Sequence, residues 1–344
     1  MATGAVRADA DLLAGLRRWS GDPGLEFARP SAGFSSETVV VTGSDGGRRV
    51  VRLPLLVASY PEYDLGVQAA VLDALGAAGM PVPRVLARED EDAAVGAPFL
   101  VMTFVPGRPV ADVPAFDPWI VEGGADRGRT VEEQFVDALG RLHRVDWRAA
   151  GLGSVLRVGL EADLAYWQRY VDWAADGRPA RLLADAMTWC ITTAPPDDPD
   201  RHALCWGDAR LGNVCFDPDT ARLTALLDWE LATVGPPEAD LAWYLALGDL
   251  TARFVGRRMP GALDRPAVQD RYEAALGRPV ADLAWHEVFA LVRSVAINDR
   301  QARLAAAAGV AYPGVAGDDN PVLAVLAERI DEHASRANEE RSRS

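Results

Sequence analysis

Three oxygen-bearing side chains, Asp208, Asn213 and Asp228, lie close together in the chain and beside short apolar segments. Asp208 begins a loop in the stretch CWGDARLGNVCF, Asn213 follows it five positions later, and Asp228 ends the apolar run LTALL. Carboxylate and amide oxygens are ligands that Mg²⁺ prefers, and a carboxylate can also orient or deprotonate a hydroxyl group. This order of residues therefore suits the transfer of a phosphoryl group from a nucleotide to a hydroxyl.

The spacing of Asp208 and Asn213 is that of the catalytic loop of protein kinases, in which four residues separate the aspartate from the asparagine. Asp228, in DWE, stands where those enzymes carry a metal-binding aspartate. We therefore interpret Asp208 as the catalytic carboxylate, and Asn213 and Asp228 as Mg²⁺ ligands. Aspartate and asparagine are also common turn formers, so an ordinary strand–turn–strand connection is the alternative.

A second candidate site begins in residues 30–41, PSAGFSSETVVV, where a loop of glycine and serine opens into a strand. Backbone N–H groups near Gly33 and the hydroxyls of Ser35 and Ser36 could hold phosphate oxygens, although a plain β-turn is the alternative. The next strand places Arg52 where a kinase strand carries its phosphate-binding lysine. The chain has no lysine, so all 35 of its basic residues are arginines. Arginine binds phosphate oxygens bidentately, which makes Arg52 the candidate for this contact; a surface arginine is the alternative.

The composition is that of a globular protein with more than one lobe, because 344 residues are too many for one small core. No apolar run reaches the roughly 20 residues needed to cross a bilayer, and the N-terminus lacks a signal-peptide pattern. The three cysteines form no CxxC motif, so we expect a reducing, cytoplasmic location and no membrane partner. The net charge of −15 argues against nucleic acid as a partner. That charge is compatible with a cationic acceptor, although solubility explains it equally well.

The pattern of apolar residues predicts an α+β fold with two lobes. Residues 1–104 are β-rich and predict a small, mostly antiparallel nucleotide-binding lobe with one internal helix at 62–78. Residues 105–107 are the expected hinge. Residues 108–336 predict a mainly helical lobe that carries the catalytic and acceptor-binding residues, with its first helix at 130–145. Residues 337–344 are charged and are expected to form a disordered tail.

Several stretches together resemble the aminoglycoside phosphotransferase and choline-kinase-like superfamily, which has a protein-kinase-like fold. The most specific are WGDARLGNVCF, LTALLDWELATVGPPEADLAWYL, LGRLHRVD and GAPFLVMTFVPG. The resemblance covers roughly residues 25–310 and is strongest to the branch that contains the kinase-like domain of certain acyl-CoA dehydrogenases. It implies that the γ-phosphoryl group of ATP or GTP moves, with Mg²⁺, to a hydroxyl group of a small molecule.

The resemblance also implies roles for residues outside the first motif. Asp240, in EADLAW, is similar to a family aspartate that braces the catalytic loop, although an acidic residue at the start of a helix would look the same. Met102, Thr103 and Val105 belong to a segment that resembles the hinge whose backbone holds the nucleobase. His143 resembles a structural position beneath the site.

Three positions depart from the family pattern. Trp206 replaces the histidine of the usual HGD, so we expect the contacts by which that histidine braces the loop to be missing. Arg52 replaces the phosphate-binding lysine, and Gln68 aligns best with the glutamate that would pair with it. An arginine–glutamine contact lacks the Coulombic attraction of an ion pair, so weaker or differently arranged nucleotide binding is expected. None of the departures touches the three residues of the first motif, and we therefore expect an active enzyme.

The acceptor is the least determined part of the prediction. Tyr166 and Tyr170 share one helix face, where they form either a wall for a flat or sugar-like acceptor or part of the core. Asp299 could bind a cationic or hydroxyl-rich acceptor or lie at the surface. An antibiotic or related natural product, and hence resistance, is the first hypothesis. A hydroxylated metabolite such as a hydroxyacyl thioester or an amino alcohol is the second, and a nucleotide-binding pseudokinase that acts as a regulator is the third.

Overall fold

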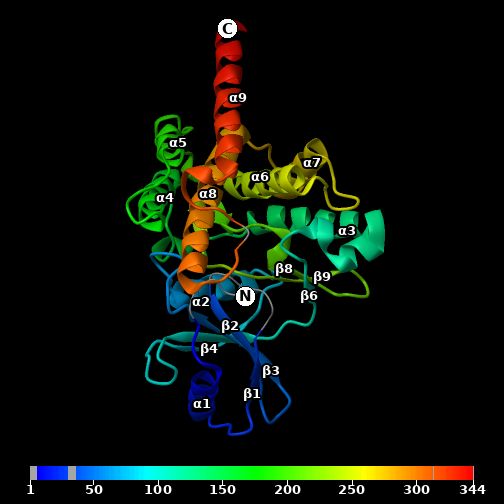
Figure 1. Cartoon of the computed structure of the whole chain (residues 1–344). Helices are drawn as coiled ribbons and strands as arrows, with labels where there is room; N and C mark the ends of the chain where they lie inside the picture. The colour runs from blue at the N-terminus through cyan, green and yellow to red at the C-terminus, as the bar shows by residue number, and fades with distance from the viewer. Residues whose placement is uncertain (1–5, 30–35, 313, 344) are drawn as a thin grey trace.

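The computed structural model describes residues 6–29, 36–312 and 314–343. These residues form two unequal lobes, as the sequence predicts (Figure 1). The smaller lobe, at the bottom of Figure 1, holds a β-sheet with helices α1 (Asp9–Ser20) and α2 (Leu65–Ala77). The larger lobe above it is mainly helical. None of the helices in the described part of the chain has the length and apolar character needed to span a membrane.

The smaller lobe is built on a five-stranded antiparallel sheet in the order β1-β2-β3-β5-β4. β-branched residues alternate along its strands, and Val39 and Val51 point into a small core closed by Leu12 of α1. The register places Arg52 between Thr38 and Leu100. The strands are β1 (Glu26–Ala28), β2 (Ser36–Thr42), β3 (Arg48–Pro54), β4 (Val85–Glu89) and β5 (Phe99–Thr103).

Helix α2 connects the sheet to the larger lobe. Asp64 caps the helix, because its carboxylate accepts hydrogen bonds from the backbone N–H groups of Gly66 and Val67. The helix packs against β4 and β5, and its Leu72 belongs to the same buried cluster as Met102 and the core residues of the larger lobe. One continuous core thus runs beneath the segment that joins the two lobes.

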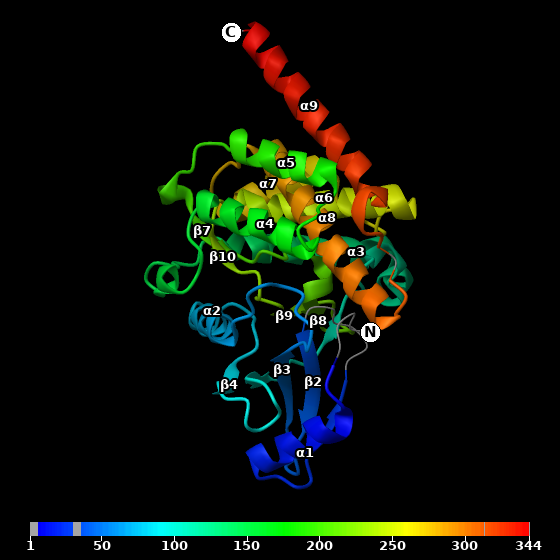
Figure 2. The ribbon, with the colours of Figure 1, turned by 60° about the vertical axis from the view of Figure 1, so that its left-hand side comes forward.

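The larger lobe is organised around α8, which packs against α4, α5, α6 and α9 (Figure 2). Helices α3 and α7 pack together on the other side of α6. The helices are α3 (Pro118–Leu142), α4 (Leu160–Ala174), α5 (Arg181–Thr192), α6 (Glu238–Val255), α7 (Arg265–Leu276), α8 (Leu283–Ala308) and α9 (Val322–Arg343).

Short strands interrupt these helices and hold the loops of the first sequence motif. β7 (Ala203–Cys205) pairs with β10 (Thr233–Gly235), and β8 (Val214–Phe216) lies between β6 (Arg108–Pro109) and β9 (Leu223–Leu226). The loop from β7 to β8 carries Asp208 and Asn213, and the segment after β9 carries Asp228.

Helix α3 begins twelve residues earlier than predicted, at Pro118. Asp117 caps it by accepting hydrogen bonds from Trp119 and Ile120, and a proline in the first turn needs no intrahelical donor. Gly124 has φ of +66° and kinks the helix. The glycines and prolines of this stretch had favoured a loop, but they mark a capped start and a kink.

The end of the chain also differs from the prediction. Helix α9 extends to Arg343, so its backbone is helical over residues 337–343, and the expectation of a disordered tail there is wrong. The charged residues of this stretch suggested disorder, but Glu and Arg also have high helix propensity.

Candidate active site

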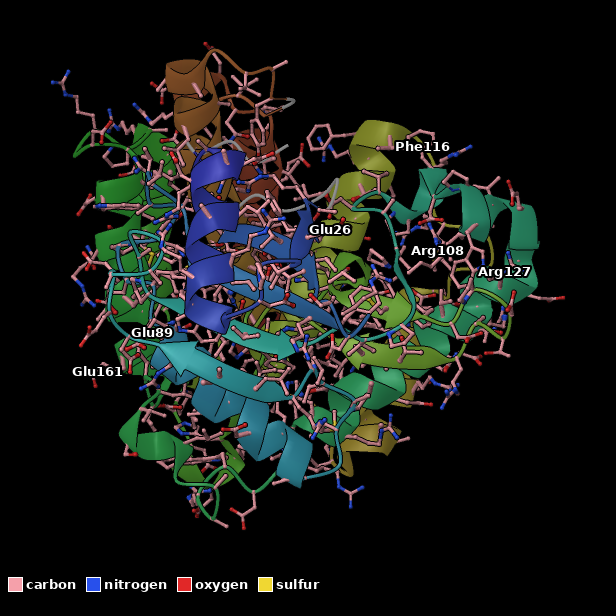
Figure 3. All side chains as sticks on the ribbon, turned by 90° about the horizontal axis from the view of Figure 1, so that it is seen from below. Glu26, Glu89, Arg108, Phe116, Arg127 and Glu161 are labelled. Carbon is pink, nitrogen blue, oxygen red and sulfur yellow. The ribbon has the colours of Figure 1, made fainter. Side chains whose placement is uncertain are left out.

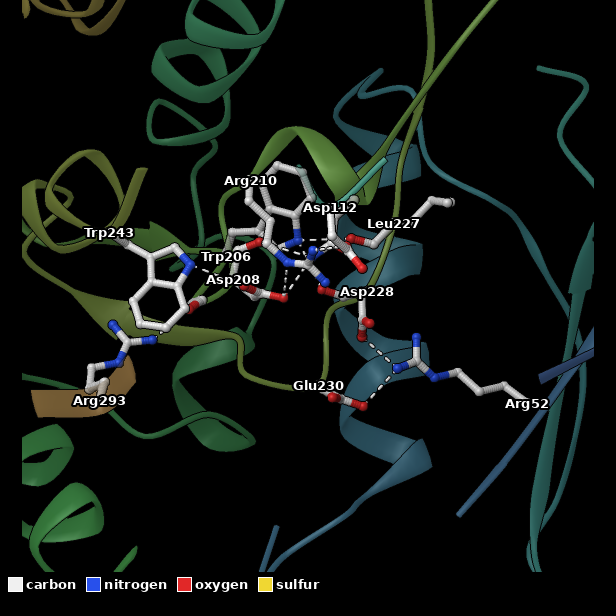
Figure 4. A network of polar contacts seen from close by, with 12 residues as sticks. Arg52, Asp112, Trp206, Asp208, Arg210, Leu227, Asp228, Glu230, Trp243 and Arg293 are labelled. Atoms are coloured by element: carbon white, nitrogen blue, oxygen red, sulfur yellow. Dashed lines mark hydrogen bonds and ion pairs between the residues drawn. The ribbon is translucent and has the colours of Figure 1, made fainter. Parts of the chain in front are cut away.

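A cavity of about 840 Å³ lies between the lobes and contains the three residues of the first motif. Asp208, Asn213 and Asp228 line it from the larger lobe, and Arg52 lines it from the sheet of the smaller lobe. Figure 4 shows that Arg52, from the sheet of the smaller lobe, and Asp208 and Asp228, from two segments of the larger lobe, belong to one network of polar contacts.

The carboxylate of Asp208 is held by three side-chain donors. Its Oδ2 atom accepts hydrogen bonds from Asn213 Nδ2 at 2.7 Å and Arg210 Nε at 3.0 Å, and its Oδ1 atom accepts one from Trp243 Nε1 at 3.0 Å. Burial alone would raise the pKa of Asp208, but the charge of Arg210 and the three hydrogen bonds outweigh it and hold the pKa below its ordinary value. The group is therefore an oriented, ionised carboxylate at neutral pH.

Asn213 and Asp228 are brought together by the backbone. The N–H group of Leu227 donates to the carbonyl of Asn213 at 2.8 Å, which joins the two segments. Because Asn213 Nδ2 is engaged by Asp208, the amide oxygen is the atom that a cation would meet. Asp228 has φ of +64°, a left-handed conformation that costs about 1 kcal/mol for a residue other than glycine. One carboxylate and one amide oxygen form a donor set that suits Mg²⁺.

Arg52 reaches across the cavity to the larger lobe. Its Nη2 atom lies 2.5 Å from Asp228 Oδ1 and 2.7 Å from Glu230 Oε2, and its Nε atom donates to the hydroxyl of Tyr63 at 2.9 Å. Burial disfavours the charged guanidinium, but Asp228, Tyr63 and Glu230 outweigh this effect and keep the pKa of Arg52 well above its ordinary value. A permanent cation therefore lies beside the proposed metal ligand (Figure 4).

The expectation that Arg52 would lack an ion-pair partner is wrong. Gln68 is buried and lines the cavity, but its Nε2 atom has no hydrogen-bond partner in the described part of the chain. The carboxylate that pairs with Arg52 is that of Glu230, from the opposite lobe. Sequence reasoning missed Glu230, although its position two residues after Asp228 in DWE was a signal.

Trp206 also makes contacts within the site. Its Nε1 atom donates to the backbone carbonyls of Leu227 and Asp228, at 2.9 Å each, and its ring stacks on Trp229 with centroids 5.1 Å apart. The loss of the histidine's own contacts stays a prediction, but the indole supplies contacts of its own that the sequence did not suggest. The indole links the start of the catalytic loop to the backbone of the segment that carries Asp228.

Asp240, in the first turn of α6, contacts the backbone of the catalytic loop directly. Its Oδ2 atom accepts from Trp206 N at 2.6 Å and its Oδ1 atom accepts from Gly207 N at 2.8 Å. His143 lies behind it, with Nε2 at 2.9 Å from Asp240 Oδ2 and Nδ1 at 2.6 Å from the hydroxyl of Tyr272. These buried contacts fix the backbone immediately before Asp208.

A buried arginine that the sequence did not single out supports the same loop from α8. Arg293 Nη2 donates to the carbonyl of Gly207 at 2.5 Å. Its guanidinium lies 4.7 Å from the ring centroids of both Trp167 and Trp243. Because Trp243 in turn donates to Asp208, this arginine fixes the carboxylate as well as the backbone.

The smaller lobe and the segment that follows it line the cavity with Ser36, Met102, Thr103 and Val105, all of which were predicted to bind the nucleotide. The N–H group of Thr103 donates to the carbonyl of Arg84 at 2.9 Å, so this donor is already used within the smaller lobe. Gly33 and Ser35, the other predicted phosphate-binding residues, lie outside the described residues.

The predicted acceptor residues do not line the cavity. Tyr166 and Tyr170 are at most 2% exposed, and the Tyr170 hydroxyl donates to the carbonyl of Ser59 at 3.0 Å. Asp299 is buried, and its oxygens accept from Arg303 Nε at 2.7 Å and from a backbone N–H at 2.6 Å. These assignments are corrected: the aromatic stripe is the core face of α4, and Asp299 holds local structure.

The wall beyond Asp208 is made instead by α6 and α8. The sequence could not single out these residues, because a cavity-lining position and a core position of a helix have the same apolar periodicity. The side chains that these helices contribute include Trp243, Tyr244, Leu247, Ser294, Ile297 and Asn298.

Comparison with known proteins shows which family and which relatives this chain is similar to. A model of the phosphotransferase enzyme family (APH) matches residues 26–275. Acyl-CoA dehydrogenase family member 11 of Gallus gallus is 37% identical over 175 residues, which are 50% of this chain and 22% of that protein. Aminoglycoside 3'-phosphotransferase of Streptomyces fradiae is 29% identical over 187 residues, 52% of this chain and 63% of that protein. The chain thus spans about a fifth of the first relative.

Solved structures share the fold at low sequence identity. A protein from Ralstonia eutropha JMP134 superposes with a TM-score of 0.67 at 23% identity, over 94% of this chain and 95% of that one. Macrolide 2'-phosphotransferase type I gives 0.58 at 20% identity, over 90% and 99%. An aminoglycoside phosphotransferase from Streptomyces rimosus, in complex with ADP and streptomycin, gives 0.52 at 22% identity, over 84% and 97%. These likenesses confirm the predicted two-lobed, kinase-like fold.

Proposed function

The chain belongs to the phosphotransferase enzyme family, and from this premise we propose that it moves the γ-phosphoryl group of ATP or GTP to a hydroxyl group of a small molecule. The observation that carries the proposal is the position of the ionised Asp208 in one cavity with Asp228, Asn213 and Arg52. The ADP bound to the Streptomyces rimosus enzyme supports a nucleotide as co-substrate. A reducing cytoplasm, where these nucleotides occur, suits the three free, buried cysteines.

In the proposed reaction, Asp208 accepts a hydrogen bond from the acceptor hydroxyl and orients its oxygen toward the γ-phosphorus. As that oxygen forms its bond to phosphorus, the bond to the bridging β-phosphate oxygen breaks, the nucleoside diphosphate leaves, and Asp208 takes the hydroxyl proton. A carboxylate with a lowered pKa is a weak base, so we assign Asp208 mainly to orientation, with proton transfer late in the step.

Asn213 and Asp228 are the proposed ligands of Mg²⁺, since they supply hard oxygen donors from two segments that the backbone joins. Bound there, the ion would neutralise charge on the phosphate oxygens. Asp240 is the proposed brace, because it fixes the loop through two backbone N–H groups.

Arg52 is the proposed contact for the α- and β-phosphates. In this structure Arg52 and Asp228 bind each other. Phosphate oxygens would compete for Arg52, and the metal would compete for Asp228. Glu230 can keep Arg52 in the cavity throughout. Ser36, with Gly33 and Ser35, is proposed to complete the phosphate site. For the nucleobase we propose the hinge segment Met102, Thr103 and Val105. Because the N–H group of Thr103 is already engaged, we propose that a backbone N–H group after Thr103 donates to the base.

Two acceptor classes follow from the relatives. The aminoglycoside and macrolide phosphotransferases favour an antibiotic and hence resistance. The identity of 37% to an acyl-CoA dehydrogenase family member favours a hydroxylated metabolite. The pseudokinase alternative is weakened by the convergence of Asp208, Asn213 and Asp228 on one cavity. A sensitive bacterial host that expresses the gene, tested on an antibiotic panel, separates the first two: unchanged inhibitory concentrations throughout argue against resistance.

The activity itself is tested by mass spectrometry of pooled hydroxyl compounds incubated with the protein, Mg²⁺, ATP and GTP. We expect a product heavier by one phosphoryl group, and we expect its formation to require both Mg²⁺ and Asp208. Asp208→Asn, which keeps the side-chain shape, is the matched control, with folding checked by circular dichroism. Nucleotide binding without any turnover in a broad screen would instead support the pseudokinase.

A further inference from the structure

The charged side chains at the acceptor end of the cavity favour a different acceptor from the one that the net charge of the whole chain favours. The net charge of −15 is compatible with a cationic acceptor. Within the described lining, however, three of the five acidic residues belong to the reaction centre, and Asp112 forms an ion pair with Arg210. Glu132 is the remaining carboxylate that could meet an acceptor cation.

Glu132 is already fully engaged by the protein. It is 4% exposed, its Oε1 atom accepts from the hydroxyl of Tyr244 at 2.5 Å, and its Oε2 atom accepts from the backbone N–H of Leu263 at 2.5 Å. Burial raises the pKa of its carboxyl, which favours the uncharged form. The acceptor end therefore offers no available anion, among the described residues, for an ammonium group.

Two arginines line the same part of the cavity. Arg258 lies 2.7 Å from Asp249, which neutralises it. Arg257 instead donates to the backbone carbonyl of Ala115, and its guanidinium lies 4.1 Å from the ring centroid of Phe116. Figure 3 shows Phe116 at the outer edge of the larger lobe. Arg257 is exposed and forms no ion pair with any described residue, so a backbone carbonyl and an aromatic ring hold the guanidinium in place without neutralising its charge.

The wall that α6 and α8 give the cavity includes a group of apolar side chains beside the polar Ser294 and Asn298. Trp243, which donates to Asp208, begins the wall, and Leu247, Met259 and Ile297 continue it. These apolar side chains bind alkyl or ring carbons through their removal from water.

We propose that the acceptor is a hydroxylated compound with an apolar body and an anionic end, whose charged group Arg257 receives while Asp208 holds its hydroxyl. The inference rests on the proposed phosphotransferase function and names the substrate class of that same site. Polyamine sugars are disfavoured, because their ammonium groups would meet Arg257 and find Glu132 already occupied.

Three ten-carbon probes test the charge of the far end while chain length and reacting hydroxyl stay the same: 10-hydroxydecanoate, 1,10-decanediol and 10-amino-1-decanol. We expect kcat/KM for phosphorylation, and affinity measured by calorimetry with ADP and Mg²⁺ present, to fall in that order. The acid should exceed the amine by at least about tenfold. Arg257→Glu should reverse the order of kcat/KM for the acid and the amine, because it changes their KM values. The variant should leave nucleotide affinity unchanged. Arg253→Glu, at an exposed position four residues earlier that does not line the cavity, is the matched control and should leave the order of acid and amine unchanged.

The outcomes separate the inference from the function on which it rests. Equal or better binding of the amine, or an order that Arg257→Glu does not alter, would overturn the inference even if another alcohol is phosphorylated. Binding of none of the three probes would also overturn it. The proposed function is judged independently by Mg²⁺-dependent turnover of ATP or GTP that disappears in Asp208→Asn.

Discussion

At the reaction centre nearly every polar group is held by another side chain, whereas the acceptor end of the same cavity includes apolar side chains from two long helices. Asp208 has three donors, and Arg52 contacts two carboxylates and a tyrosine. At the other end, Leu247 of α6 and Ile297 of α8 offer only carbon atoms. The centre constrains geometry and charge, while the acceptor end constrains shape and apolar contact.

This difference separates what should be common to many phosphotransferases from what should be particular to this chain. Positioning a phosphoryl group requires fixed charges in fixed places, so substitutions there should change the rate of the chemical step. Substitutions of an apolar wall should change how well an acceptor binds, with little effect on the step itself. Each experiment below tests one side of this contrast.

The largest expected effect is that of Asp208→Asn. The variant keeps the shape of the side chain but loses the charge that orients and finally accepts the hydroxyl proton, so kcat should fall by about 10²–10⁴-fold. Nucleotide affinity should change little. The matched change at the other end, Leu247→Ala, should raise the KM of the acceptor and leave kcat nearly unchanged. If kcat of Asp208→Asn falls by only a few-fold, the proposed role of Asp208 is wrong.

Arg52→Gln should have the next largest effect, on nucleotide binding. The change removes the proposed phosphate cation and breaks the ion pair of Arg52 with Glu230, whose side chain is 5% exposed. We expect the Kd of Mg²⁺–ATP to rise by about 10–100-fold. Glu230→Gln should weaken binding less, because the cation of Arg52 itself is retained. Arg49→Gln, on the same strand but at the exposed surface, is the control and should leave the Kd unchanged.

The reaction centre was largely predictable from sequence because its chemistry requires particular residue types at short, fixed spacings. Asp208 and Asn213 lie on one loop, and Asp228 follows the next strand, so local spacing placed them together correctly. Glu230 and Arg293 were missed for a physical reason. Glu230 acts by meeting a residue 178 positions away, and Arg293 reaches the loop from a helix 86 positions away.

The acceptor end could not be predicted, because helical periodicity reports which face is buried but not what it is buried against. Tyr166 and Tyr170 have the spacing of a ligand-binding wall and belong to the core, whereas Leu247 and Ile297 look like core residues and line the cavity. Trp206 shows a related limit. Its type suggested a lost contact, but the indole N–H reaches two carbonyls that only the folded loops bring near it.

A moderate effect on stability is expected from Trp206→Phe. A smaller aromatic ring remains to pack against Trp229, but the carbonyls of Leu227 and Asp228 lose their shared donor. The free energy of unfolding should fall by about 1–3 kcal/mol, measured by urea denaturation. A fall in kcat larger than the loss of stability explains would show that the indole also positions Asp228. Unchanged stability would mean that the brace contributes nothing, and that the centre is less rigid than its contacts indicate.

The smallest expected effect concerns how stability depends on pH. One carboxyl of the reaction centre, Asp208, and one of the acceptor wall, Glu132, should contribute to stability in different pH ranges. The pKa of Asp208 is lowered in the folded protein, so its contribution to stability is present above the ordinary value of 3.8 and is lost as the pH falls through the lower folded value. Burial raises the pKa of Glu132, so its contribution is present below 4.5 and is lost as the pH rises through the higher folded value.

The two variants should therefore respond to pH in opposite directions when each is compared with the wild type. The stability deficit of Asp208→Asn should shrink as the pH falls below about 4, whereas that of Glu132→Gln should shrink as the pH rises above about 5. Urea denaturation of the three proteins between pH 3 and pH 7 measures both differences. Parallel curves for the two variants would mean that these carboxyls have similar surroundings, and the contrast between a charged centre and an apolar acceptor wall would then have no electrostatic basis.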